Sequence, residues 1–89
     1  MTTALMDPLL TITPRQLELL ALYASGYELR EIAEVKFLSY SAVQQSLAVA
    51  RERAQARSLT HLAVMCLDAG LLRKNGIGYK PVQDERVIG

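Results

Sequence analysis

The chain has a single cysteine and a single histidine among its 89 residues. The lone Cys66 excludes a disulfide within the chain and any metal site that needs several cysteine ligands. It is expected to be a small buried apolar group rather than a reactive thiol. His61 has no second plausible ligand nearby, so a surface or capping histidine is favoured over a metal ligand. The sequence therefore predicts neither a metal nor a cofactor.

Long apolar runs and the usual catalytic patterns are also missing. No run approaches the roughly 20 apolar residues needed to span a bilayer, and no basic region precedes the short apolar patch at the start, unlike in a signal peptide. A cytoplasmic protein without membrane contact is expected. The chain lacks a glycine-rich phosphate loop, a histidine with a nucleophile partner, and paired acids in an apolar setting. An enzyme is therefore not expected.

Charge of either sign is in short supply, with a net value of only +1. Residues 1–40 hold three basic and five acidic side chains, whereas residues 41–89 hold seven basic and four acidic ones. Phosphate affinity comes mainly from Lys and Arg, so a monomer is expected to bind DNA modestly. A solvated charge pattern without any partner is the alternative. About half of the residues are hydrophobic, which suffices for one small domain.

The first confident helix is predicted to start after Thr13. Thr13 and Gln16 have the spacing of a capping box, and Pro14 suits the first helical position. The helix is expected to run to about Ala24, because Gly26 can take the left-handed conformation that ends helices. Residues 1–11 are read as a leader that lies against the core or against a second subunit.

Two further apolar patterns meet at a short turn. The first predicts a helix from about Glu28 to residue 35 or 36, and the second a helix from residue 40 or 41 that could run past Ala54 to 56 or 57. Ser39 or Ser41 can cap the second helix. Phe37 and Leu38, in the turn, are expected to be core anchors. Two helices joined in this way form a helix-turn-helix arrangement.

The second of these helices presents a polar side. Its apolar positions have the three- and four-residue spacing of one helix face: Val43, Leu47, Ala50 and Ala54. Gln44, Gln45 and Ala48 would lie away from Val43 and Leu47. Glutamine can hydrogen-bond to the edge of adenine in the major groove, so Gln44 and Gln45 are predicted to contact bases.

A fourth helix is expected at about residues 59–70, and it is apolar around most of its circumference. One side can be buried within the domain, so the other is predicted to form a homodimer interface through Leu59, Leu62, Met65 and Cys66. In the alternative, the protein is a monomer in which the leader folds over this helix and covers it with Leu5, Leu9 and Leu10. From residue 73 onward a polar tail is expected, in which Asn75, Gly76 and Gly78 mark turns and possible hairpin geometry.

Several short segments occur in the order and spacing of a known family, without gaps from Ile12 to Leu72. They are Ile12 to Leu20, Ala24-Ser25-Gly26, Arg30-Glu31-Ile32-Ala33, Leu38-Ser39, Ala42-Val43, Arg57-Ser58 and Thr60. In these residues the chain resembles the LuxR-type, or GerE-type, helix-turn-helix domain. It departs from the family at Gln44, where a basic residue is usual, and at Gln55, where the family has glycine.

The resemblance implies an all-α, four-helix domain over residues 12–72, with a leader at 1–11 and a flexible C-terminal tail at 73–89. It implies that the third helix enters the major groove of double-stranded DNA and that the fourth commonly supports dimerisation. The positions that match the family's base contacts are Gln44, Gln45 and Ala48. The positions that match its phosphate contacts include Thr13, Arg15, Arg30, Ser41 and Ser46. The expected function is a sequence-specific, DNA-binding transcription regulator that acts as a homodimer. The alternative is a protein-interaction module on the same fold that binds RNA polymerase or another regulator.

Overall fold

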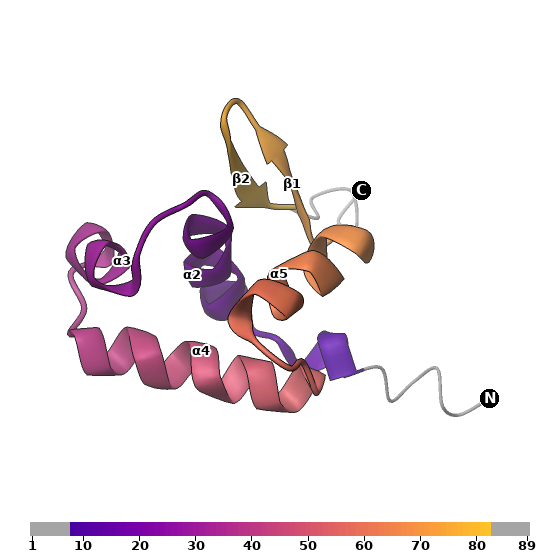
Figure 1. Ribbon diagram of the computed structural model, residues 1–89, viewed down its shortest axis with the longest axis horizontal. Coiled ribbons are helices and arrows are strands. Elements are labelled where there is room, and N and C mark those ends of the chain that lie inside the picture. The colour runs from indigo at the N-terminus through magenta and orange to yellow at the C-terminus, as the bar shows by residue number, and fades with distance from the viewer. Residues whose placement is uncertain (1–7, 83–89) are drawn as a thin grey trace, which may run out of the picture.

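A computed structural model describes residues 8–82 of the chain (Figure 1). Within that range the fold is mostly helical, with four α-helices between a short 3₁₀ helix and a two-stranded antiparallel sheet. The elements are η1 (Pro8–Thr11), α2 (Pro14–Ala24), α3 (Leu29–Lys36), α4 (Tyr40–Ala54), α5 (Leu59–Asp68), β1 (Leu72–Asn75) and β2 (Gly78–Pro81). The prediction of four helices is confirmed, although α4 ends at Ala54 and does not continue to residue 56 or 57.

Side-chain caps explain where the helices begin. The hydroxyl oxygen of Thr13 accepts the Gln16 N–H at 3.1 Å, and the Gln16 Oε1 accepts the Thr13 N–H at 2.9 Å, so the predicted capping box is present. Ser39, rather than Ser41, caps α4, and Ser58 caps α5. Each cap satisfies an N–H group that the first helical turn leaves without a partner.

The core lies where α2, α4 and α5 meet, with α3 packed against α4 and η1 against the opposite part of that helix. The largest fully buried side chains are Leu19, Leu20, Ile32, Val43, Leu47, Leu62 and Cys66. Ala50 and Ala54 are buried as well, and their small size allows neighbouring backbones to approach α4 closely. Burial therefore covers one whole stripe of α4 and leaves the opposite side to solvent.

All four α-helices end in the same hydrogen-bonded turn, which contains a residue with a positive φ one or two positions after the last helical residue. At the end of α4 the Ala56 N–H donates to the Arg51 carbonyl and the Gln55 N–H to the Glu52 carbonyl, both at 3.0 Å. The positive-φ residues are Gly26 (103°), Phe37 (57°), Gln55 (60°) and Gly70 (82°). Phe37, at the end of α3, and Gln55, at the end of α4, thus have a left-handed backbone conformation that favours glycine.

The expectation that Phe37 anchors the core is wrong. Its side chain is 94% exposed. The left-handed backbone at Phe37 turns the chain between α3 and α4, and the neighbouring Leu38 is the residue that packs against the core. Apolar character alone suggested burial, but the backbone conformation directs the Phe37 side chain outward.

The prediction of a purely helical domain with a flexible tail from residue 73 also needs correction, because residues 72–81 form a β-hairpin. Leu72 is buried at its base, and the Val82 N–H donates to the Leu71 carbonyl at 2.9 Å. At the C-terminal end of α2, the Ser25 hydroxyl accepts the Tyr79 N–H at 2.7 Å, which fastens β2 to α2. Residues 83–89, the rest of the predicted tail, lie outside the described range.

Replacing Gln55 by glycine should stabilise the domain. Removal of left-handed strain of about 1–2 kcal/mol, offset by the chain entropy of glycine, should raise the free energy of unfolding by about 0.5–1 kcal/mol. Phe37→Gly should act in the same direction, since it removes little buried surface. Urea denaturation followed by circular dichroism measures both effects.

The matched control is Gly70→Ala. It places a side chain on a left-handed residue at the end of α5, as Gln55 does at the end of α4. An added Cβ at Gly70 meets no atom within 4 Å, so any loss reports the backbone conformation alone. Gly70→Ala should lower stability by a similar amount. A destabilising effect of Gln55→Gly would mean that the left-handed turn is not the strained feature described above.

Candidate functional site

The outward side of α4 is a helix face that the fold leaves exposed to solvent. Residues spaced by four, three and four positions line it, directly opposite the buried stripe: Ser41, Gln45, Ala48 and Glu52. Gln45 is exposed at the centre of this face, Ala48 is half-buried beside it, and Gln44 is exposed along one edge. All three predicted base-contacting residues thus share one surface, which we call the outward face of α4. The predicted set did not include Glu52.

An arginine stands at the N-terminal end of this face. The Arg30 guanidinium lies over the ring of Tyr40, with its carbon 5.3 Å from the ring centroid. This cation–π contact contributes roughly 0.5–1 kcal/mol at an exposed site and restrains a long side chain. Ser41, in the first turn of α4, is exposed, and Ser39 supplies the cap. The predicted phosphate contacts Arg30 and Ser41 therefore lie close to the same end of α4.

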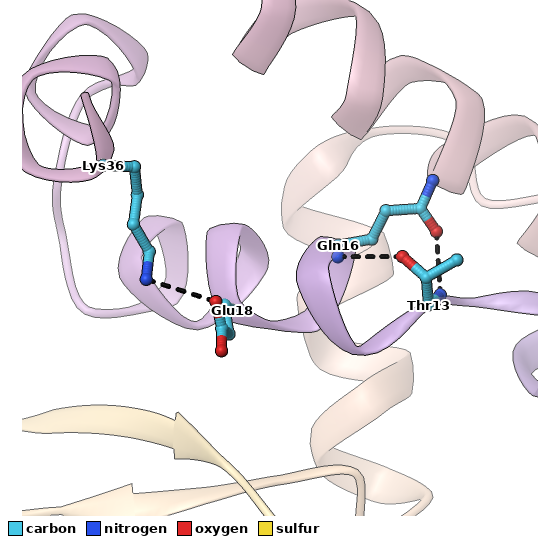
Figure 2. A network of polar contacts seen from close by, with 4 residues as sticks. All are labelled: Thr13, Gln16, Glu18 and Lys36. Carbon is cyan, nitrogen blue, oxygen red and sulfur yellow. Dashed lines mark hydrogen bonds and ion pairs between the residues drawn. The ribbon is translucent and has the colours of Figure 1, made fainter. Parts of the chain in front are cut away.

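The first turn of α2 joins the middle of α4 through Gln16, the one buried polar residue of the described range. Its Nε2 donates to the backbone carbonyl of Ser46 at 3.3 Å, while its Oε1 completes the capping box with Thr13 (Figure 2). Both the oxygen and the nitrogen of the Gln16 side-chain amide therefore form hydrogen bonds. It holds Thr13, and with it the start of α2, against the half-buried Ser46.

Arg15 reaches the turn that precedes α4. With Glu18, Leu19, Lys36 and Leu38 it lines a surface hollow of about 200 Å³. The Lys36 Nζ lies 3.2 Å from the Glu18 Oε1, so an ion pair joins α3 to α2 at this hollow (Figure 2). An exposed pair of this kind contributes at most about 1 kcal/mol. It nevertheless occupies Lys36 and leaves Arg15 as the unpaired cation of the hollow.

Most arginines around the outward face have no acidic partner. In residues 8–82 the ion pairs are Lys36–Glu18 and Arg51–Glu52. Arg51 also donates to the Ala56 carbonyl at 3.1 Å, which commits it to the loop after α4. The arginines of the described range near α4 that form no ion pair are Arg15, Arg30, Arg53 and Arg57. These cations lie around the two ends of the helix.

The predicted dimer interface needs correction. Leu62 and Cys66 are fully buried in the core, and Leu59 and Met65 are half-buried. Positions 59, 62 and 66 follow helical spacing and form the inward side of α5, so Leu62 and Cys66 are not available to a second subunit. The outward apolar residue is Val64, which is 55% exposed and which sequence reasoning did not select.

A surface hollow of about 300 Å³ lies beside Val64, between α5, α2 and β2. It is lined by Tyr23, Ala24, Thr60, Ala63, Val64, Leu67 and Tyr79. The hydroxyl groups of Tyr23 and Thr60 are 3.1 Å apart and satisfy each other. The lining is otherwise mainly apolar. Leu9, one of the leader residues proposed to cover α5, packs against the core, whereas Leu5 and the side chain of Leu10 lie outside the described residues.

Cys66 and His61 have the structural roles that were expected of them. Burial raises the pKa of the Cys66 thiol to about 11, so the reactive thiolate is scarce at neutral pH. The Nδ1 atom of His61 accepts the Arg57 N–H at 3.0 Å, within the cap of α5. In the part of the chain that the structure describes, no group of three His, Cys, Asp or Glu side chains is placed to hold a metal ion. Nor is any helix of that part long and apolar enough to cross a membrane.

Comparisons with family models, curated proteins and solved structures found no match. The resemblance to LuxR-type domains therefore stays a prediction. Any assignment of function rests on the residues themselves and on the outward face of α4.

Proposed function

We propose that the chain is a sequence-specific, double-stranded DNA-binding transcription regulator of the LuxR/GerE-type fold, with α4 as the reading helix. One observation carries the proposal. The outward face of α4 is polar, lies along one side of the molecule (Figure 1), and has unpaired arginines near both ends. A face of this kind can approach a polyanion closely because, among residues 8–82, neither bulky loops nor the hairpin stands in front of it.

The dimensions of α4 suit the major groove. Its 15 residues span about 22 Å at about 1.5 Å per residue, and a groove about 12 Å wide admits one α-helix. Gln44 and Gln45 are assigned to base edges, where a glutamine amide matches the donor and acceptor of adenine. Ala48, small and half-buried, is assigned to an apolar contact such as a thymine methyl group.

The phosphate contacts are assigned to groups that the fold holds beside α4. Arg30, steadied by Tyr40, and Ser41 serve the N-terminal end. At the start of α2, Arg15 and Thr13 are assigned to phosphate contacts. The Thr13 hydroxyl oxygen accepts the cap hydrogen bond, so its proton remains available to a phosphate oxygen. Ser46 is half-buried, so among these residues it has the smallest accessible surface. Glu52 adds negative charge to the outward face and favours modest affinity per subunit.

We assign the working unit to a homodimer that pairs through the outer side of α5, around Val64 and its adjoining hollow. A two-fold pair uses the same patch on both subunits. It would also present two reading helices to half-sites about one helical turn apart. The small size of the patch favours a dimer that forms mainly on DNA.

A protein-interaction module on the same fold, binding RNA polymerase or another regulator, is the second candidate. The apolar hollow beside Val64 favours it, because such a surface fits a protein better than a phosphate backbone. The two candidates differ in one outcome. A regulator that reads DNA enriches a preferred sequence from a random duplex library, and a module without DNA affinity does not.

Substitution of Gln45 by alanine should relax base preference at one position of each half-site. A glutamine–adenine contact is worth about 1–3 kcal/mol of discrimination, and Gln44→Ala should act at a neighbouring position. Selection from the random duplex library, followed by gel-shift titration, measures both. Gln55→Ala is the matched control, since this exposed glutamine lies beyond the end of α4. If both reading-face variants select the wild-type sequence unchanged, the assignment of this face to base reading fails.

Alanine at Arg15 or Arg30 should weaken binding to all duplexes alike. Each lost phosphate contact should lower the slope of log affinity against log salt by roughly one unit. Fluorescence anisotropy over a range of salt concentrations gives the slope. Arg73→Ala is the matched control, because Arg73 is equally exposed but belongs to the hairpin. A loss restricted to one DNA sequence would argue against a phosphate contact.

Val64→Glu should abolish pairing while leaving the domain folded, because the side chain is already half in solvent. Sedimentation of the wild-type protein on its selected duplex should give two copies per site, and the variant should bind singly and more weakly. Ile77→Glu, a change at a fully exposed apolar residue of the hairpin turn, is the control. Circular dichroism verifies folding. Wild-type protein that binds as one copy per site would exclude the dimer.

A further inference from the structure

The β-hairpin has one covered edge and one open edge. On β2, the backbone N–H of Tyr79 points away from β1 to the Ser25 hydroxyl. The register pairs Tyr79 with Lys74. In an antiparallel pair, the backbone groups of such a position point outward on both strands. The N–H and C=O of Lys74 therefore face away from β2, and they form no hydrogen bond with any residue from 8 to 82.

The hairpin that carries the open edge is basic on both strands. From residue 71 to residue 82 the chain carries Arg73, Lys74 and Lys80 and no acidic side chain. None of the three forms an ion pair within the described range. Arg73 and Lys80 are direct partners across the two strands, and like charges in that position destabilise a hairpin. An anionic ligand on this edge would relieve the repulsion.

The turn adds an apolar contact point. Gly76 has a φ of 67°, and Ile77 follows it as the second turn residue, an arrangement typical of a type II′ turn. The Ile77 side chain is fully exposed. A solvated phosphate chain gains little from an isoleucine, whereas an apolar side chain of a protein segment can pack on it.

The hairpin is held in place before any partner arrives. Ser25 binds Tyr79, and a Cβ added at Gly78 would lie 2.8 Å from the Ser25 hydroxyl oxygen, so β2 approaches α2 as closely as glycine allows. The hairpin projects from the side of the molecule opposite α4, with α2 and α5 between them (Figure 1). A ligand of the hairpin would therefore not compete with a ligand of α4.

We propose that the outer edge of β1 is a docking site for an extended acidic segment of a partner protein, which adds to the hairpin as a third strand. Backbone groups of the segment would pair with those of Lys74, the exposed outward-facing position of β1. Its carboxylates would meet Arg73 and Lys74, and an apolar residue would rest on Ile77. A second copy of the chain fits poorly, because pairing two β1 edges would bring their basic residues together. This site goes beyond DNA binding and needs no contact by α4.

The test is an NMR titration of the isotopically labelled full chain with a synthetic octapeptide in which pairs of glutamates alternate with pairs of threonines, so that carboxylates reach both faces of the hairpin. The expected result is a change in the amide signals of Lys74 and of its neighbours Arg73 and Asn75, with slower hydrogen exchange at Lys74. Arg73→Gln combined with Lys74→Gln should weaken binding about tenfold, since each exposed charge pair contributes a few-fold. Arg53→Gln combined with Arg57→Gln, which removes two exposed arginines elsewhere, is the matched control and should change nothing.

Three further probes distinguish other occupants. A peptide of the same charge with proline for every threonine cannot form the ladder, so equal binding of this peptide would overturn the strand addition. Equal binding of single-stranded oligothymidylate at β1 would assign the edge to nucleic acid instead. A large gain in peptide affinity on Asp84→Asn with Glu85→Gln would mean that the chain's own end occupies the edge. Absence of amide changes in β1 would also overturn the proposal, and none of these results depends on whether α4 binds DNA.

Discussion

The orientation of α4 depends on one constraint, the burial of the stripe from Val43 to Ala54 against the surrounding helices. Apolar burial contributes about 25 cal/mol per Å², so rotation of α4 that exposed Leu47 would cost more than the marginal stability of so small a domain allows. Because successive helix residues are about 100° apart, fixing the stripe also fixes the opposite side. The outward direction of Gln45 is thus a consequence of core packing and needs no contact of its own.

The polar contacts around α4 refine this orientation. The Gln16 amide ties the start of α2 to the middle of α4, and Tyr40 restrains Arg30 at the helix start. Groups that would touch a phosphate backbone are in this way positioned by contacts with neighbouring side chains and backbone of the fold. The same arrangement leaves α5 and the hairpin on other sides of the molecule, where they can serve a second subunit or a partner protein. The proposed activities therefore use separate surfaces of one small core.

Local signals in the sequence predicted the helices well, because capping is a short-range effect. The box formed by Thr13 and Gln16 and the left-handed Gly26 bound α2 where they were expected. Phe37 was misassigned because apolar character says nothing about a positive φ. The sequence does not distinguish a β-hairpin from a polar tail with turns after residue 73, because strands of four residues show little periodicity. Ser25, which fastens the hairpin, lies 54 residues before its partner Tyr79 in the chain.

The sequence also predicts part of the candidate site, namely the residues that share the outward face of α4. Gln44, Gln45 and Ala48 could be grouped from helical spacing alone, because α4 has one apolar stripe. That argument fails for α5, which is apolar all round. Only the packed structure distinguishes the inward Leu62 and Cys66 from the outward Val64. Glu52 lies on the same face by helical spacing, but a carboxylate does not match the base-reading chemistry by which that face was predicted. The contact between Arg30 and Tyr40 was not predictable, because it joins two helices.

The central claim is that the outward face of α4, with the arginines beside it, binds duplex DNA. The most direct measurement is an amide chemical-shift map of the labelled chain titrated with duplex DNA at low salt. The account predicts that shifts concentrate in the first turns of α2 and α4 and along Gln44, Gln45 and Ala48, and that they fade as salt is raised. Shifts confined to α5 and the hairpin, or no shifts at any salt concentration, would contradict it.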